Sequence, residues 1–291
     1  MIVDKIVYLN GALVPWGEAR LSPLDRGFLY GYGLFETMRC YGGRVFRLDR
    51  HLARLMHSAE RLALAAALDP PELEQAILKT IEANKLSDAR IRLTVSAGEG
   101  ERGLAPPTSG KVTIFVVAEE LVLPARIYQE GVGTVIVSLR RNSQSPLSQT
   151  KSLNYLDSLI AYSEALAQGA DEAIMLNERG FVAEGSTSNI FLGMAGKLLT
   201  PSPESGILPG ITREAVLELA HAVGIEVVEG EIPPSDLLQA DEVFLTSSVR
   251  EIVPVVRVDG NVIGSGRPGE MTIKLMAAYK ELVRKELSEA C

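Results

Sequence analysis

The residues from Asn142 to Tyr155 read NSQSPLSQTKSLNY, and Lys151 is the only charged side chain between Arg141 and Asp157. We expect an apolar helix to begin just after this lysine. A lysine that enters such a helix with no carboxylate nearby in sequence is partly desolvated, which lowers the pKa of an amine and makes it a nucleophile for Schiff bases. The alternative is a solvent-facing lysine in a polar loop, which is the commoner role and which the local sequence favours.

The bulk composition indicates an ordinary globular protein and excludes several classes of function. The chain has 291 residues, of which 46% are hydrophobic and 23% charged, with a net charge of -8. This acidic balance argues against a nucleic-acid partner, and no run of about 18 apolar residues predicts a membrane span. The N-terminal residues read as neither a signal peptide nor an anchor. The two cysteines, Cys40 and Cys291, form no metal or disulfide motif, so we expect a reduced, cytoplasmic protein.

The apolar pattern predicts two α+β domains. We expect a smaller N-terminal domain over residues 1–121, a linker over 122–130, and a larger C-terminal domain over 131–291. The expected strands are Ile6–Leu9, Ala12–Pro15, Leu34–Tyr41, Arg44–Leu48, Ala89–Ala97, Lys111–Ala118, Gly131–Val137, Glu172–Leu176, Asn189–Leu192 and Glu242–Thr246. Asn10-Gly11 predicts a hairpin between the first two strands, and we expect Ala89–Ala97 to pair with Lys111–Ala118. The expected helices are one capped by Asp49, then Pro71–Asn84, Leu153–Gln168, Thr212–Val223 and Met271–Glu289. A cleft between two such domains is a common place for a ligand.

Two segments are typical of phosphate sites. Gly210-Ile-Thr-Arg-Glu214 begins a predicted helix, where free backbone N–H groups and the helix dipole attract anions. Thr246-Ser-Ser248 follows a predicted strand and can supply further N–H groups and hydroxyls. The simpler alternatives are a helix cap and a strand-to-loop turn.

Glu184 is the only charge in Ala183-Glu-Gly-Ser-Thr-Ser-Asn189, which we expect to be a loop between two strands. A carboxylate held inside a cleft needs a partner, and a protonated pyridine nitrogen is one. The alternative is a solvated carboxylate at a turn.

Histidine and the common catalytic motifs contribute little. His51, His57 and His221 lie in predicted helices, and we interpret each as a surface or packing residue. The chain has no H-E-x-x-H and no phosphate-binding G-x-x-x-x-G-K-[ST] motif, and we identify no metal site.

Six motifs in order resemble fold-type IV pyridoxal-phosphate enzymes, the class IV aminotransferase family. The family includes branched-chain aminotransferases, D-amino-acid aminotransferases and aminodeoxychorismate lyases. The resemblance covers nearly the whole chain, and its motifs are Asp25-Arg-Gly27 with Gly31-Tyr-Gly-Leu-Phe-Glu36, Phe46-Arg-Leu48 to Leu55, Lys151-Ser-Leu-Asn-Tyr155, Glu184-Gly-Ser-Thr-Ser-Asn189, Leu208-Pro-Gly-Ile-Thr-Arg213, and Asp241 to Pro254. It implies an α+β, two-domain fold with pyridoxal 5′-phosphate (PLP) in the interdomain cleft, and a homodimer or higher homo-oligomer.

The resemblance also implies roles for single residues. Lys151 would hold PLP as a Schiff base and move the substrate proton, and Glu184 would keep the pyridine nitrogen protonated. Tyr155 would donate to the phenolic oxygen of the ring. The remaining cofactor contacts, mainly to the phosphate, would come from Arg54, as a bidentate clamp, and from Ile211, Thr212, Ser247 and Ser248.

The substrate positions separate the members of the family less clearly. Phe35 and Arg92 match the branched-chain enzymes, with Arg102 a further candidate. Those enzymes typically read F-E-G-[IV]-R, whereas this chain reads Phe35-Glu-Thr-Met-Arg39, and their carboxylate-side Tyr corresponds to Arg90.

The departures keep three other interpretations open. The Tyr, Arg and His that trap the carboxylate in D-amino-acid enzymes correspond to Phe35, Arg102 and Leu104, so two of the three are missing. The F-E-T-x-R form and the Glu99–Leu104 loop also resemble aminodeoxychorismate lyases, which release pyruvate and 4-aminobenzoate. We favour a transaminase acting on branched-chain-type L-amino acids and glutamate, with the lyase as the alternative. A cofactor carrier without catalysis is the alternative from another class.

Overall fold

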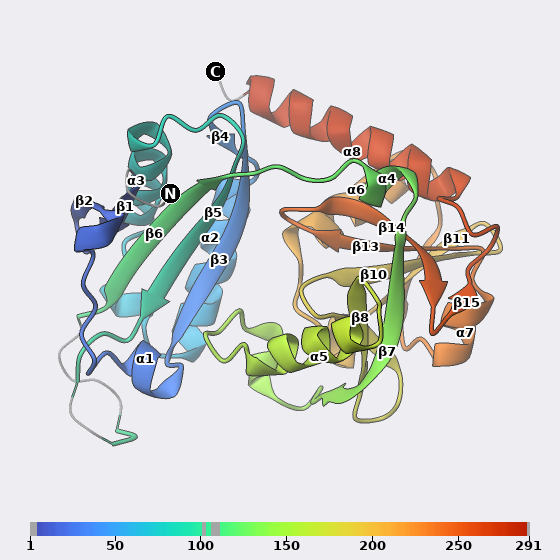
Figure 1. Ribbon diagram of the computed structural model, residues 1–291, viewed down its shortest axis with the longest axis horizontal. Helices are drawn as coiled ribbons and strands as arrows, with labels where there is room; N and C mark the ends of the chain where they lie inside the picture. Colours follow the sequence, from blue (N-terminus) through green and yellow to red (C-terminus); the bar gives the residue numbers. More distant parts are fainter. Residues whose placement is uncertain (1–4, 101–102, 106–110, 290–291) are drawn as a thin grey trace. The chain divides into compact units, whose positions relative to one another are not determined.

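The computed structural model describes residues 5–100, 103–105 and 111–289, and the chain divides into two compact units. Unit 1 runs to Val122 and includes Thr150–Asn154; unit 2 comprises Leu123–Gln149 and the chain from Tyr155 onward. Figure 1 colours unit 1 mainly blue to cyan and unit 2 mainly green to red. Each unit mixes helices with one sheet, so each is α+β.

Unit 1 is built on an antiparallel sheet. Its strands are β1 (Ile6–Leu9), β2 (Ala12–Pro15), β3 (Gly33–Tyr41), β4 (Arg44–Val45), β5 (Ala89–Ser96) and β6 (Thr113–Glu120), in the spatial order β2-β1-β6-β5-β3-β4. The predicted hairpin forms at Asn10-Gly11, where both residues have positive φ, as the tight turn favoured between twisted strands requires. The predicted pairing of the fifth and sixth strands is also present, from Ala89 opposite Glu120 to Ser96 opposite Thr113.

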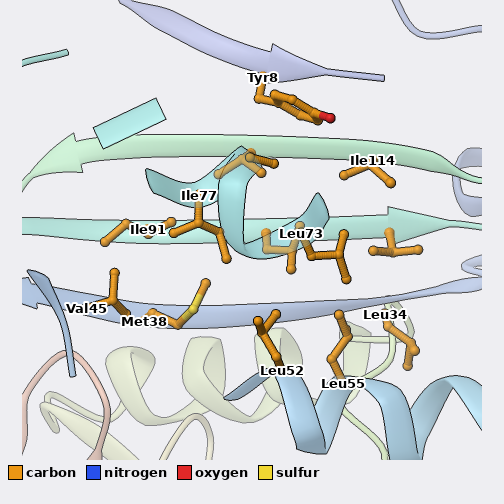
Figure 2. Packing of buried hydrophobic residues seen from close by; sticks show 14 of the residues in the cluster. Tyr8, Leu34, Met38, Val45, Leu52, Leu55, Leu73, Ile77, Ile91 and Ile114 are labelled. Atoms are coloured by element: carbon orange, nitrogen blue, oxygen red, sulfur yellow. The ribbon is translucent and has the colours of Figure 1, made fainter. Parts of the chain in front are cut away.

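Helices α2 (Leu48–Arg61) and α3 (Pro70–Ala83) pack on this sheet, and a short helix, α1 (Arg26–Tyr30), precedes β3. Figure 2 shows Leu52 and Leu55 of α2 against Leu34 and Met38 of β3, in the core that α3 completes with Leu73 and Ile77. The prediction that Asp49 caps α2 was wrong. Asp49 lies in the first turn of the helix, where its negative charge still complements the dipole.

The segment Thr150–Asn154 adds to the edge of β3. The Phe35 amide donates to the Lys151 carbonyl at 3.0 Å, and the Leu153 amide donates to the Gly33 carbonyl at 2.9 Å. The predicted start of a helix at Leu153 was therefore wrong, because these residues pair with β3 and α5 (Leu156–Ala167) begins three residues later. The segment also packs with unit 1 rather than with the domain 131–291 expected from the sequence.

In unit 2, nine strands of the described chain form one mixed sheet in the order β12-β11-β10-β13-β14-β7-β8-β9, with β15 on β14. The strands are β7 (Val132–Arg141), β8 (Glu172–Asn177), β9 (Val182–Gly185), β10 (Asn189–Met194), β11 (Lys197–Pro201), β12 (Val227–Gly230), β13 (Glu242–Ser247), β14 (Glu251–Val258) and β15 (Asn261–Val262). The helices are α4 (Arg126–Gln129), α5, α6 (Ile211–Ala222), α7 (Pro234–Gln239) and α8 (Glu270–Glu289). Helix α5 lies along β7 and β8 (Figure 1). Among the residues described, no helix has the length and apolar content of a membrane span.

One polar group interrupts the apolar core of unit 1, and we call Glu36, His51 and Arg54 the Glu36 cluster. Glu36 is 0% exposed and His51 1%. Arg54 donates through Nε to Glu36 Oε1 at 2.9 Å and through Nη2 to Oε2 at 2.7 Å, and His51 Nδ1 lies 2.7 Å from Oε2. The interpretation of His51 as a packing residue fits this burial, and its alternative as a surface residue does not.

The charges of the cluster follow from these contacts. Burial raises the pKa of Glu36, but the Arg54 charge and the His51 hydrogen bond outweigh it and lower the pKa to about 2. Burial lowers the pKa of His51. Near neutral pH Glu36 is therefore ionised and can only accept a hydrogen bond. His51 is neutral because its pKa is lowered, and it donates Nδ1–H to Glu36.

Stability in acid should depend on Glu36. A folded pKa of about 2 against the ordinary 4.5 corresponds to about 3 kcal/mol of unfolding free energy. Because the folded pKa is depressed, this contribution is present above pH 4.5 and is lost as the pH falls towards 2. We expect Glu36→Gln to flatten the fall of unfolding free energy over this range, measured by urea titration at a series of pH values.

Glu119→Gln is the matched control, since Glu119 also has a lowered pKa, through hydrogen bonds from Lys5 and Arg90, but is partly solvated. It should leave the slope nearly unchanged. Equal slopes in the wild type and Glu36→Gln would contradict the assignment.

Candidate functional site

In unit 1, Lys151 lies beside the aromatic ring that the sequence placed in the substrate pocket. Lys151 Nζ is 4.4 Å from the centre of the Phe35 ring, and the guanidinium carbon of Arg92 is 3.8 Å from the same centre. Both distances are within the range of cation–π attraction. Antiparallel pairing sets Thr37 of β3 opposite Arg92 of β5, so Arg92 shares the face of the sheet that carries Phe35. The fold thus gathers three of the predicted site residues.

Arg54 comes from the helix-covered face of the same sheet. Side chains alternate along β3, so Phe35 and Glu36 point to opposite faces. Burial lowers the pKa of His51 most, the charge of Arg54 lowers it further, and the charge of Lys151 also contributes. The Glu36 cluster and Lys151 therefore share one electrostatic environment, and sequence reasoning gave Glu36 and His51 no role in it.

In unit 2, Glu184 lies on strand β9, so the prediction of a loop at this position was wrong. The carboxylate is buried, with Oε1 3.1 Å from Arg141 Nη2 and Oε2 accepting from the Leu208 amide at 3.0 Å. Asn189 Nδ2 donates to the Leu208 carbonyl at 2.8 Å and lies 3.5 Å from Glu184 Oε2. Arg141 also donates to the carbonyls of Gly206 and Ser148. Glu184 is thus held by three groups that fix its orientation.

The sequence alone assigned no role to Arg141. The one sequence feature that could have drawn attention to Arg141 is that it is the last charged residue before Lys151. In the structure it is the last residue of β7. Nothing local marks it as the partner of Glu184, which is far along the chain on another strand.

The beginning of α6 has the features of an anion site. Gly210 is the N-cap, and a Cβ at Gly210 would lie 2.1 Å from Asn189 Oδ1, so only glycine fits beside the first residue of β10. Ile211 and Thr212 are buried. The Thr212 hydroxyl is buried and, among the described residues, has no hydrogen-bond partner. A buried donor at a helix N-terminus is the arrangement that a phosphate satisfies.

The end of β13 supplies the second predicted phosphate segment. The pairing of β10 with β13 sets Asn189 opposite Thr246, which brings this segment to the strand end that adjoins Gly210. The hydroxyl of Thr246 is a second buried group for which the described chain offers no partner. Ser247 accepts from the Arg250 amide at 3.3 Å, and Ser248 is half-buried. The donors present therefore fit a bound phosphate.

The other predicted residues are less informative. Tyr155 is half-buried at the N-cap of α5. Arg102 lies outside the described residues, and Leu104 is 89% exposed. Arg90 pairs with Glu119 at 2.7 Å and is largely solvated, so it is engaged away from the Phe35 ring.

Comparison with known proteins places these features in one family. The model for amino-transferase class IV matches residues 33–258. A protein of Methanocaldococcus jannaschii, named provisionally as a branched-chain-amino-acid aminotransferase, is 43% identical over 96% of each chain. The aminodeoxychorismate lyase of Bacillus subtilis is 36% identical over 98% of this chain and 97% of its own.

Solved structures agree. A T.th. branched-chain amino acid aminotransferase, complexed with N-(5′-phosphopyridoxyl)-L-glutamate, has a TM-score of 0.89 and 32% identity, covering 97% of this chain and 95% of that one. The resemblance inferred from the six motifs is confirmed, and the chain belongs to the class IV aminotransferase family.

Proposed function

We propose that this protein is a PLP-dependent aminotransferase that moves an amino group between a branched-chain-type L-amino acid, or glutamate, and a 2-oxo acid. The observation that carries the proposal is the placement of Lys151 and Arg92 on the Phe35 ring. It sets a nucleophilic amine beside a cation that can bind a substrate carboxylate. The similarity to branched-chain enzymes over nearly the full chain supports the same assignment.

The cofactor is PLP, and the chain has suitable groups for each part of it. Its phosphate would be bound by the N–H groups of Ile211 and Thr212, the Thr212 hydroxyl, Ser247, Ser248 and the guanidinium of Arg54. When bound, PLP supplies a ring that accepts the electrons of the carbanion formed at the substrate Cα. Tyr155 would donate to the phenolic oxygen.

Two side chains would manage the protons. Lys151 would bind the cofactor covalently through Nζ, and once displaced by substrate it would take the proton from Cα and return it at C4′. Glu184 would keep the pyridine nitrogen protonated. Arg141 and the Leu208 amide hold the carboxylate in one orientation, so little reorganisation accompanies the reaction.

Substrate recognition rests on the face of β3 and β5 that carries Phe35. Arg92 would offer a fixed positive charge to a carboxylate, and the buried Phe35 ring would support the Arg92 and Lys151 side chains from beneath. The lyase is kept as the alternative because the Bacillus subtilis lyase is 36% identical over 98% of the chain. Both reactions begin with the same proton removal, so Lys151 does not separate them.

Replacing Lys151 tests the cofactor assignment. Lys151→Ala should lose the visible absorbance of the lysine-bound cofactor, and kcat should fall by about 10²–10⁴-fold or more, because the base is removed. Lys197→Ala is the control, since Lys197 is solvated and paired with Glu226. A Lys151→Ala protein that keeps both colour and turnover would refute the role.

Half-reactions with single substrates test the reaction class. Purified enzyme is mixed separately with L-leucine, L-glutamate, D-alanine and D-glutamate, and the visible band is followed. We expect both L-amino acids to convert the enzyme to its amine form. Conversion by the D-pair alone would overturn the stereochemical assignment. No conversion by any of the four, with pyruvate released from aminodeoxychorismate, would replace the transaminase by the lyase.

We also propose that the enzyme is a homodimer. On α5, the side chains of Leu156, Leu159 and Ile160 are about half or more exposed, while Ala161 and Ala165 of the same helix are fully buried. On α1, in unit 1, Phe28 is 78% exposed. Exposed apolar side chains that lie together on one helix, as on α5, are typical of subunit interfaces. A second copy of this chain is the occupant we assign, because a two-fold interface buries the same surface on both partners.

Charge on α5 should weaken such a dimer. Leu159→Glu should raise the dimer dissociation constant by about tenfold or more, since each copy loses a buried leucine. Sedimentation velocity over a concentration series measures this. Val262→Glu, at a half-exposed apolar residue of β15 in the same unit, should leave the constant unchanged. A monomeric wild type, or equal effects of both variants, would contradict the proposal.

A further inference from the structure

The Glu36 cluster is a costly way to stabilise unit 1. Glu36 lies on the face of β3 that also carries Leu34 and Met38, and those two side chains pack against Leu52 and Leu55 of α2 (Figure 2). Burying a carboxylate among apolar groups costs several kcal/mol, and replacing a buried ion pair by apolar residues is often neutral or stabilising. Packing alone therefore does not account for the cluster.

Its geometry fixes the plane of one guanidinium. The two oxygens of Glu36 accept from Nε and Nη2 of Arg54, at 2.9 and 2.7 Å. Such a two-point contact determines both the position and the orientation of a planar guanidinium, which a single contact does not.

His51 completes the restraint on the carboxylate. It donates to Oε2, the oxygen that also accepts from Arg54 Nη2. The carboxylate is therefore held from α2 at two positions, His51 and Arg54, which lie three residues apart and so on one side of the helix. Rotation of Glu36 away from Arg54 would break both contacts at once.

We propose that Glu36 and His51 are positioning residues, which hold Arg54 in the orientation that binds the cofactor phosphate. The inference rests on the proposed function, since it needs Arg54 to bind that phosphate. It adds that the affinity for the phosphate is set by a buried carboxylate and a neutral histidine that act through Arg54.

Comparing PLP with pyridoxal isolates the phosphate contact, because pyridoxal lacks the phosphate. The dissociation constants of both are measured by absorbance titration of the cofactor-free enzyme, and their ratio gives the preference for PLP. Glu36→Gln should lower this preference about tenfold, the lower end of the loss seen when the outer partner of a metal ligand is removed. A purely structural defect would weaken both compounds alike and leave the ratio unchanged.

Arg54→Gln gives the preference for PLP of an enzyme that lacks the phosphate-binding arginine. The double variant tests whether Glu36 acts through Arg54. If Glu36 acts through Arg54, adding Glu36→Gln to Arg54→Gln should not lower the preference further. Glu119→Gln, which removes the carboxylate of another ion-paired glutamate of unit 1, should leave the ratio at the wild-type value.

A matched pair at His51 keeps the test independent of Glu36. Asn can present an N–H near the place of Nδ1, whereas Leu cannot, so His51→Asn should keep most of the preference for PLP and His51→Leu should lose it. Circular dichroism before each titration shows whether the variants fold.

The outcomes separate the two levels of the argument. If Arg54→Gln leaves the preference unchanged, Arg54 does not bind the phosphate, and the proposed phosphate site falls together with this inference. If Arg54→Gln lowers it but Glu36→Gln and His51→Leu do not, the site stands and the positioning role is wrong. Equal ratios in His51→Asn and His51→Leu would likewise overturn the role of the histidine.

Discussion

The hydrogen bond from the Phe35 amide to the Lys151 carbonyl is the contact on which the proposed chemistry depends. It fastens a segment that comes after β7 in the chain to the edge of the sheet in unit 1. Because the backbone at Lys151 is paired with β3, its side chain is set beside the Phe35 ring rather than left on a loop with many conformations. In the proposed role as a nucleophile, an amine fixed in this way would lose little entropy when it reacts.

Much of unit 1 followed from local pattern. The Asn10-Gly11 hairpin, the alternation along β3 and β5, and the apolar stripe of α2 are short-range signals, and the structure has all of them. The start of α5 was misplaced because Leu153 looks like a helical residue until the carbonyl of Gly33 is available to it. Likewise Val182-Ala-Glu-Gly185 is short, with a charge and a glycine, and becomes a strand because β8 pairs with it. Such pairings depend on partners that no local window contains.

The residues of the candidate site likewise divide into those that the sequence predicted and those that it did not. Lys151, Glu184 and the start of α6 were predicted because their motifs are contiguous, and their surroundings could not be. The partners of Glu36 and Glu184, two of the buried carboxylates, come from other elements: Arg54 and His51 for Glu36, and Arg141 for Glu184. In both cases an arginine neutralises a carboxylate that would otherwise be costly to bury. The charged groups are thereby held in single orientations, which catalysis needs more than stability does.

Thr37 bears on how the family's reactions diverge. Branched-chain enzymes typically carry glycine at this position, two residues after the phenylalanine. Here Thr37 lies on the face of β3 that carries Phe35 and directly opposite Arg92. A β-branched side chain at this point occupies volume beside the guanidinium that glycine leaves open, and it adds a hydroxyl that can accept from an arginine. In the proposed mechanism, proton removal by Lys151 would be common to transaminase and lyase, so the choice between them would arise from how the substrate is held after that step. Arg90, the other departure from the branched-chain pattern on this face of β5, is engaged by Glu119, whereas Thr37 lies directly opposite Arg92. Relative to a glycine at the same position, Thr37 therefore narrows the space beside the Arg92 guanidinium.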